Sequence, residues 1–140
     1  MQLEKTKAFY RQITSRDLCS CAYCQTYRRE IKASYPNVAA YLSQLGVDIE
    51  KPFETMPLDP DEFGMLEYLC AQYIVYGTPE DFTEMAVDSV QIGLAGPHPS
   101  TGIADEHFVI ELSPIYLKWE MRDRSIHSSI HARSMASANR

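Results

Sequence analysis

Three of the four cysteines in this 140-residue sequence fall within six positions, at Cys19, Cys21 and Cys24. Thiolates are strong ligands for Zn²⁺ and for iron, and the spacing from Cys21 to Cys24 is the C-x-x-C spacing of many zinc sites. Cys19 adds a third sulfur to this pair. The cluster therefore predicts a metal site, and zinc is the expected ion.

A tetrahedral zinc site needs a fourth ligand, which must come from elsewhere in the chain. The candidates are Cys70, His107, His127 and His131. The two last histidines are four positions apart, so they would share one face if their segment is helical. Cys70 lies in an apolar run and is expected to be a core residue more than a ligand. No second C-x-x-C follows downstream, which counts against a four-cysteine site.

Two other interpretations of the cluster stay open. In a thiol–disulfide oxidoreductase or redox sensor, Cys21 would be the nucleophile and Cys24 the resolving thiol. A helix that starts at the cluster would lower the pKa of Cys21 through its dipole and free backbone N–H groups, helped by nearby arginines. In the third interpretation the cysteines are reduced, half-buried residues of a purely structural domain.

A helix is expected from residue 22, because aromatic and apolar residues recur at every fourth position: Tyr23, Tyr27, Ile31 and Tyr35. Pro36 should end it, since the residue before a proline avoids the helical region. Asn37 is the expected cap of a second helix that stops near Gly46. Residues 1–17 fit either a helix or a short strand.

Beyond residue 52 the apolar residues become β-branched and aromatic, and Gly, Pro and Asp punctuate them. Strands are expected at residues 53–56, 65–76, 86–94, 107–112 and 115–121, with a helical turn after Pro79 and a loop at 96–105. Residues 65–76 also fit a helix, opened by Asp59-Pro60-Asp61-Glu62. Gly64 and the run 73–76 favour the strand.

These elements predict one α+β domain over residues 1–121, with an N-terminal helical pair and a predominantly antiparallel sheet. Residues 122–140 form a polar tail that could be helical. Its few apolar residues would need a groove, so a homo-oligomer formed through the tail is one expectation.

The net charge of −6 is unevenly distributed. Residues 52–117 contain twelve acids and no Lys or Arg, whereas residues 1–51 contain eight bases against five acids. Such a centre is unsuited to contacting phosphates, so nucleic-acid binding is not expected. The acidic surface is expected to be a solvated face that aids solubility, and the alternative is a docking face for an unknown, basic protein partner. No apolar run is long enough to cross a bilayer and no secretory signal is present, which predicts a cytoplasmic protein.

Other polar groups are weaker candidates. His98 lies on a proline-flanked loop, and Asp105 and Glu106 precede His107 and could orient its imidazole. Three acids could contribute to a cation site, although the full calcium-loop spacing is missing: Asp59, Asp61 and Glu62. No nucleophile elbow, phosphate-binding loop or dinucleotide fingerprint appears. The expected function is therefore a non-enzymatic metal-binding or protein-interaction module.

Overall fold

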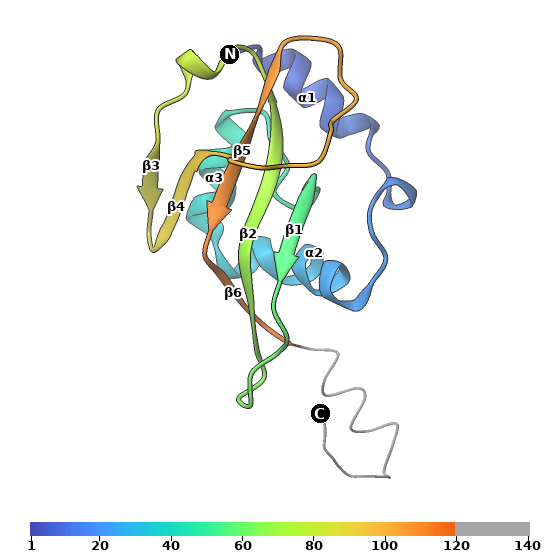
Figure 1. Ribbon diagram of the computed structural model, residues 1–140, viewed down its shortest axis with the longest axis vertical. Helices are drawn as coiled ribbons and strands as arrows, with labels where there is room; N and C mark the ends of the chain where they lie inside the picture. Colours follow the sequence, from blue (N-terminus) through green and yellow to red (C-terminus); the bar gives the residue numbers. More distant parts are fainter. Residues whose placement is uncertain (120–140) are drawn as a thin grey trace.

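The structure is a computed structural model and describes residues 1–119. Three helices come first, α1 (Leu3–Gln12), α2 (Ala22–Ser34) and α3 (Pro36–Gln44), with a 3₁₀ turn at Ser15–Asp17 between α1 and α2. Six strands follow: β1 (Glu54–Pro57), β2 (Met65–Tyr76), β3 (Met85–Val87), β4 (Val90–Leu94), β5 (His107–Ser113) and β6 (Ile115–Lys118), with a second 3₁₀ turn at Pro79–Asp81. The α+β prediction is confirmed, with one more helix than the expected pair (Figure 1).

The junction of α2 and α3 follows from Pro36. This residue occupies the first turn of α3, where its missing N–H leaves no hydrogen bond unmade. Tyr35 is both the C-cap residue of α2 and the N-cap residue of α3. The prediction that Asn37 caps the second helix was wrong. Asn37 lies inside α3, and its amide donates to a carboxylate oxygen of Asp88 at 3.2 Å. Pro36 displaced the cap by two positions.

Strand β2 is the centre of the antiparallel sheet, which confirms the strand interpretation of residues 65–76. One edge of β2 pairs with β1, and the other pairs with β5 along its second half and with β6 along its first half. The sheet continues from β5 through β4 to β3. Pro114, which has no N–H to offer a neighbouring strand, separates β5 from β6.

The segment 86–94 was predicted as a single strand and is a hairpin of β3 and β4 instead. The chain reverses at Asp88, whose φ of +54° lies in the left-handed region. Aspartate tolerates that region better than most residues, because its short side chain can hydrogen-bond locally. The last strand is also shorter than expected and ends at Lys118.

The helices cover one face of the sheet and contribute to the main core (Figure 1). The side chains buried there come from the three helices and from the inner faces of the strands: Tyr10, Tyr27, Ile31, Val38, Leu42, Leu66, Tyr68, Tyr73, Val75, Ile110, Leu112, Ile115 and Leu117. A smaller cluster of Ile74, Tyr76 and Val109 lies apart from it, packed against Phe53, Ala95 and Ile103. The helices are thereby held rigidly against β2, which positions the start of α2.

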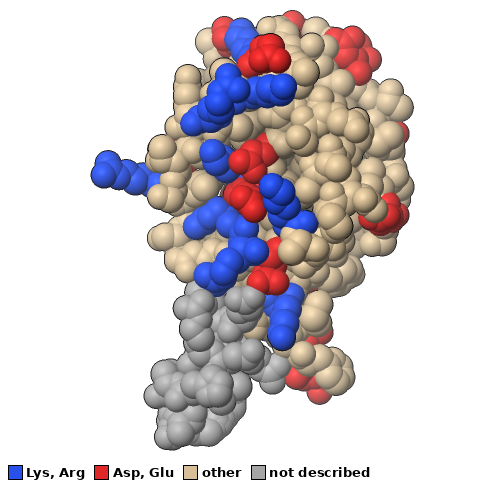
Figure 2. Space-filling model, turned by 180° about the vertical axis from the view of Figure 1, so that it is seen from behind, with Lys and Arg blue, Asp and Glu red and all other residues tan. Residues whose placement is uncertain are grey.

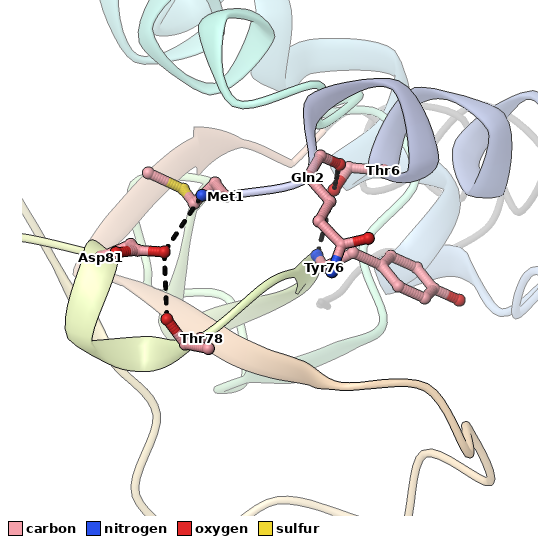
Figure 3. Close-up of polar contacts among 6 residues, drawn as sticks. All are labelled: Met1, Gln2, Thr6, Tyr76, Thr78 and Asp81. Carbon is pink, nitrogen blue, oxygen red and sulfur yellow. Dashed lines mark hydrogen bonds and ion pairs between the residues drawn. The ribbon is translucent and has the colours of Figure 1, made fainter.

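The beginning of the chain is tied to the far end of β2 (Figure 3). The Gln2 N–H donates to the Tyr76 carbonyl at 3.0 Å, and the Tyr76 N–H donates to the Thr6 hydroxyl at 3.0 Å. The Met1 ammonium lies 3.2 Å from the carboxylate of Asp81 and lowers its pKa. These contacts hold α1 across the end of the sheet.

No helix within residues 1–119 has the length and apolar character needed to cross a membrane. The expectations for residues 120–140, including the polar tail at 122–140 and its role in a homo-oligomer, lie outside the described residues.

Candidate metal centre

The three clustered cysteines meet at the start of α2. The Sγ atoms of Cys19, Cys21 and Cys24 all lie within 4.8 Å of one another. Cys19 and Cys21 are exposed and Cys24 is half-buried, and all three are free thiols. Within residues 1–119 this is the only group of three or more Cys, His, Asp or Glu side chains close enough to share a metal ion.

The backbone that carries these thiols is anchored to the helix that follows it. Cys21 is the N-cap residue of α2, and the helix begins at Ala22, which confirms the prediction of a helix from residue 22. The Gln25 side chain donates to the Ser20 carbonyl at 2.6 Å, and the Arg28 guanidinium donates to the Cys19 carbonyl at 2.7 Å. The loop is thus folded back onto the first two turns of α2, which keeps the sulfurs together.

The pKa values of Cys19 and Cys24 are shifted in opposite directions. The pKa of Cys19 is lowered, chiefly because its sulfur accepts a hydrogen bond from the Cys21 backbone N–H, with further help from the other two thiols and from Arg28. The pKa of Cys24 is raised to about 12, first because the thiol is partly desolvated, and then because it donates to Cys19. Cys19 therefore loses its proton at a lower pH than Cys24 does.

Strand β1 and the start of β2 lie beneath the cluster. The Cys24 thiol is 3.7 Å from the Thr55 hydroxyl on β1. Tyr68 on β2 donates its hydroxyl to the Tyr23 carbonyl, and Tyr23 in turn donates to Asp59 at 3.2 Å. The Tyr23 ring also packs on Trp119, with the ring centroids 5.2 Å apart. The first turn of α2 is therefore held from below; Cys24 contacts the strand beneath it, whereas Cys19 and Cys21 are exposed to solvent.

The sulfur arrangement is close to that of a metal–thiolate site. With Zn–S bonds of about 2.3 Å, tetrahedral geometry places ligand sulfurs about 3.8 Å apart. Separations within 4.8 Å need a contraction of no more than about 1 Å.

Cys70, a candidate fourth ligand, is not part of this group. It is buried on β2 beside Glu111 and Glu54, and its pKa is raised to about 11 by burial and then by those carboxylates. Glu54 and Thr55 are neighbours on β1 and point to opposite faces of the sheet. Thr55 contacts the cluster, so Cys70 lies with Glu54 on the face away from it.

His107, the second candidate, lies at the other end of the sheet. It pairs with Tyr76, whereas Thr55 pairs with Ala71, five residues earlier on β2 and about 17 Å away at the usual rise. Its Nε2 is 2.7 Å from the Thr101 hydroxyl. The other two candidates, His127 and His131, lie outside the described residues.

The imidazole of His107 is not oriented by the carboxylates that precede it. Its Nδ1 contacts the backbone carbonyl of Asp105 at 2.8 Å, while the Asp105 carboxylate pairs with Lys5. His98 is an exposed loop residue whose Nδ1 faces the Pro99 carbonyl. These polar groups serve local chain geometry.

The acids predicted as a cation site also hold a turn together. Asp61 accepts the backbone N–H groups of Phe63 and Met65 at 2.8 and 2.9 Å, and Asp59 accepts the Tyr23 hydroxyl. Asp61 therefore bonds within the hairpin that joins β1 to β2, and Asp59 connects that hairpin to α2.

Nothing in the sequence indicates that Thr55 and Tyr68 lie beside the cysteine cluster. Both reach the cluster only because β1 and β2 pass under the start of α2, and strand pairing of that kind has no local signature. Arg28, in contrast, follows from helix spacing, because it lies close in sequence to the cluster on the helix that the cluster starts.

The chain matches no family model, no curated protein and no solved structure. Its function must therefore be argued from the geometry of this site.

Proposed function

We propose that this protein is a non-enzymatic metal-binding module whose ligands are the thiolates of Cys19, Cys21 and Cys24. The observation that carries the proposal is the convergence of the three sulfurs within 4.8 Å at the start of one anchored helix. Thiolate ligands favour soft and borderline ions such as Zn²⁺ and Cu(I), and Zn²⁺ is the ion we propose.

The electrostatics support loading of a cation. Three thiolates would repel one another without a counter-charge. The pKa of Cys24 is raised chiefly by desolvation and further by its two neighbouring thiols. A divalent ion that takes the place of the Cys24 proton supplies the counter-charge that offsets this repulsion. Cys19, with its lowered pKa, offers the first sulfur to an arriving ion.

The proposed site is exchangeable. Structural zinc sites close a tetrahedron with four protein ligands, and such domains unfold without the metal. Here two of the three cysteines are exposed, and α2 is already fixed by the fully buried Tyr27 and Ile31. A fourth position is left for water or an external thiol, or for His127 or His131 if one of these residues binds.

The test is Zn²⁺ affinity, measured by competition with a chromophoric chelator on reduced full-length protein. Replacing Cys19, Cys21 and Cys24 together by Ser should abolish tight binding, whereas Cys70→Ala, on the opposite face of the sheet, should leave it unchanged. A His127→Ala/His131→Ala variant tests the fourth ligand. Equal affinities for the triple variant and the unmodified chain would refute the proposal, and preference for Cu(I) over Zn²⁺ would change only the ion.

A thiol–disulfide function is the second candidate, and the lowered pKa of Cys19 is the observation that favours it. It places the reactive thiol at Cys19, whereas the sequence pointed to Cys21. A defined reduction potential with no metal affinity would select this alternative.

A further inference from the structure

A groove on the helical side of the molecule is independent of the cysteine cluster. It has a volume of about 580 Å³ and lies among α1, the end of α2, α3 and the loop 46–51. Pockets for small ligands commonly measure about 300–1,000 Å³, so the groove is large enough for one.

The groove exists because α3 turns small side chains toward it. Pro36, Ala39, Ala40 and Ser43 line the groove at spacings of three and four, which is one face of a helix. The opposite face of α3 buries Val38 and Leu42 in the core. The floor is therefore short and largely apolar, while longer side chains from neighbouring elements stand around it.

Those longer side chains are mostly cationic. Lys7 and Arg11 come from α1, Lys32 from α2 and Lys51 from the connecting loop. Seen from behind, the lysine and arginine side chains form a band down this side of the molecule, with acidic side chains between them (Figure 2). In a chain whose net charge is −6 and whose residues 52–117 contain no base, the gathering of four bases around one groove is a marked local excess.

Two of the four cations have no counter-charge in the described part of the chain. Arg11 and Lys32 make no ion pair there, and both are exposed at the groove. Lys7 lies 3.6 Å from the exposed Glu4, and Lys51 donates to the Tyr10 carbonyl at 2.8 Å.

The two acids that line the groove, Asp48 and Glu50, do not cancel its positive charge. Asp48 is partly engaged, because it accepts the Glu50 backbone N–H at 3.0 Å and lies 4.0 Å from the Lys51 ammonium. Four cations and two carboxylates line the groove, and Glu4 outside it pairs with Lys7, so the groove still carries a net positive charge.

We propose that this groove binds a small phosphorylated molecule, with the phosphate held by Arg11 and Lys32 and an apolar body lying over the alanine floor of α3. Arginine and lysine form charge-assisted hydrogen bonds to phosphate oxygens, and arginine can bind two of them at once. The net positive charge of the groove favours an anion such as phosphate. The site does not depend on the proposed metal function.

The test uses reduced, metal-free full-length protein at about 0.1 M ionic strength, where distant charges are screened, with inorganic phosphate and phenyl phosphate as probes followed by NMR shifts. Both should bind saturably, and phenyl phosphate more tightly, because only its ring can cover the alanine floor. An Arg11→Gln/Lys32→Gln variant should bind phenyl phosphate about tenfold or more weakly. A Lys5→Gln/Lys118→Gln variant changes the net charge equally and should bind within about twofold of the unmodified chain.

A shape variant separates the groove from general charge attraction. Ala40→Leu, at an exposed position on α3, should weaken phenyl phosphate and leave inorganic phosphate nearly unchanged. The proposal is overturned by absence of saturable binding, by equal weakening in the two charge variants, or by binding of a poly-glutamate peptide to the groove with no response to either phosphate. Retention of phenyl phosphate binding in the triple Cys→Ser variant distinguishes this site from the metal site.

Discussion

Helix α2 carries two clusters of titratable side chains within about two turns of each other, and they are built in opposite ways. Tyr27 points into the core, where its hydroxyl meets that of Tyr73, which in turn donates to the Ile49 carbonyl at 2.7 Å. Both rings are fully buried, and burial raises the pKa of both hydroxyls. The cysteines at the start of the same helix are largely exposed and contact chiefly one another.

This difference indicates which of the two clusters can bind a ligand. The buried hydroxyls satisfy one another and a backbone carbonyl, so their interactions stabilise the fold and leave nothing for a ligand. The thiols are positioned by the same helix but retain unused ligand capacity at the surface. Changes in the tyrosine cluster should therefore alter stability, and changes in the cysteine cluster should alter binding.

The largest expected effect is on stability. Tyr73→Phe leaves the Tyr27 hydroxyl and the Ile49 carbonyl without a partner in the core, at a cost of about 2–4 kcal/mol in the free energy of unfolding. Tyr41→Phe is the matched control, because that half-buried hydroxyl makes no hydrogen bond within residues 1–119.

Both the Tyr41→Phe control and the triple Cys→Ser variant of the metal-free protein should stay within about 0.5 kcal/mol of the unmodified chain. Urea unfolding followed by circular dichroism measures all of them. A loss in the triple Cys→Ser variant as large as that of Tyr73→Phe would erase the distinction between the two clusters.

The cysteines should also differ in reactivity. Cys19, whose pKa is lowered, should be alkylated about tenfold or more faster than Cys24, whose pKa is about 12, and the buried Cys70 should react last. Timed iodoacetamide labelling with peptide mass spectrometry gives the order. Labelling of Cys70 together with the clustered thiols would contradict the burial on which the comparison rests.

Metal affinity should depend on pH with a definite sign. The Cys24 thiol is protonated at neutral pH, because its pKa is about 12, so Zn²⁺ must displace that proton. Each released proton weakens binding about tenfold for every unit by which the pH falls. Affinities measured between pH 8 and pH 6 in non-coordinating buffers test this, and a pH-independent affinity would exclude Cys24 as a ligand.

The smallest effect concerns the anchoring of the loop. The Arg28 guanidinium donates to the Cys19 carbonyl and helps to lower the pKa of the Cys19 thiol. Because Arg28→Gln removes both effects, Zn²⁺ affinity should fall about threefold. Lys5→Gln, which removes a charge on α1 that pairs with Asp105, serves as the control and should leave the affinity unaltered.

Much of this arrangement could be predicted from local patterns. The helical pair on either side of Pro36 follows from spacing and proline chemistry, and the strand at 65–76 follows from its β-branched and aromatic run. Helix α1 could not be predicted, because the hydrophobic pattern of residues 1–17 fits a helix and a strand equally well. The hairpin at Asp88 was missed because an aspartate can form a tight turn without glycine.

The residues of the candidate site also fall into those that local sequence predicts and those that it does not. Cys19, Cys21 and Cys24 are close in sequence, so their spacing alone was enough to single them out. The positions of Cys70 and His107 depend on which face and which end of a six-stranded sheet they occupy, and that depends on pairings between distant segments. The basic groove was missed because its four cations come from three segments that are distant in the sequence: α1, α2 and the loop 46–51.

The central claim is that three thiolates share one metal ion, and Co²⁺ titration tests it most directly. Co²⁺ can take the place of Zn²⁺ and shows thiolate charge-transfer absorption whose intensity scales with the number of bound sulfurs. The account predicts a band that saturates at one equivalent with the intensity of three thiolates, persists in Cys70→Ala and disappears in the triple Cys→Ser variant. A reduced protein that develops no such band, or a band that survives in the triple variant, would contradict it.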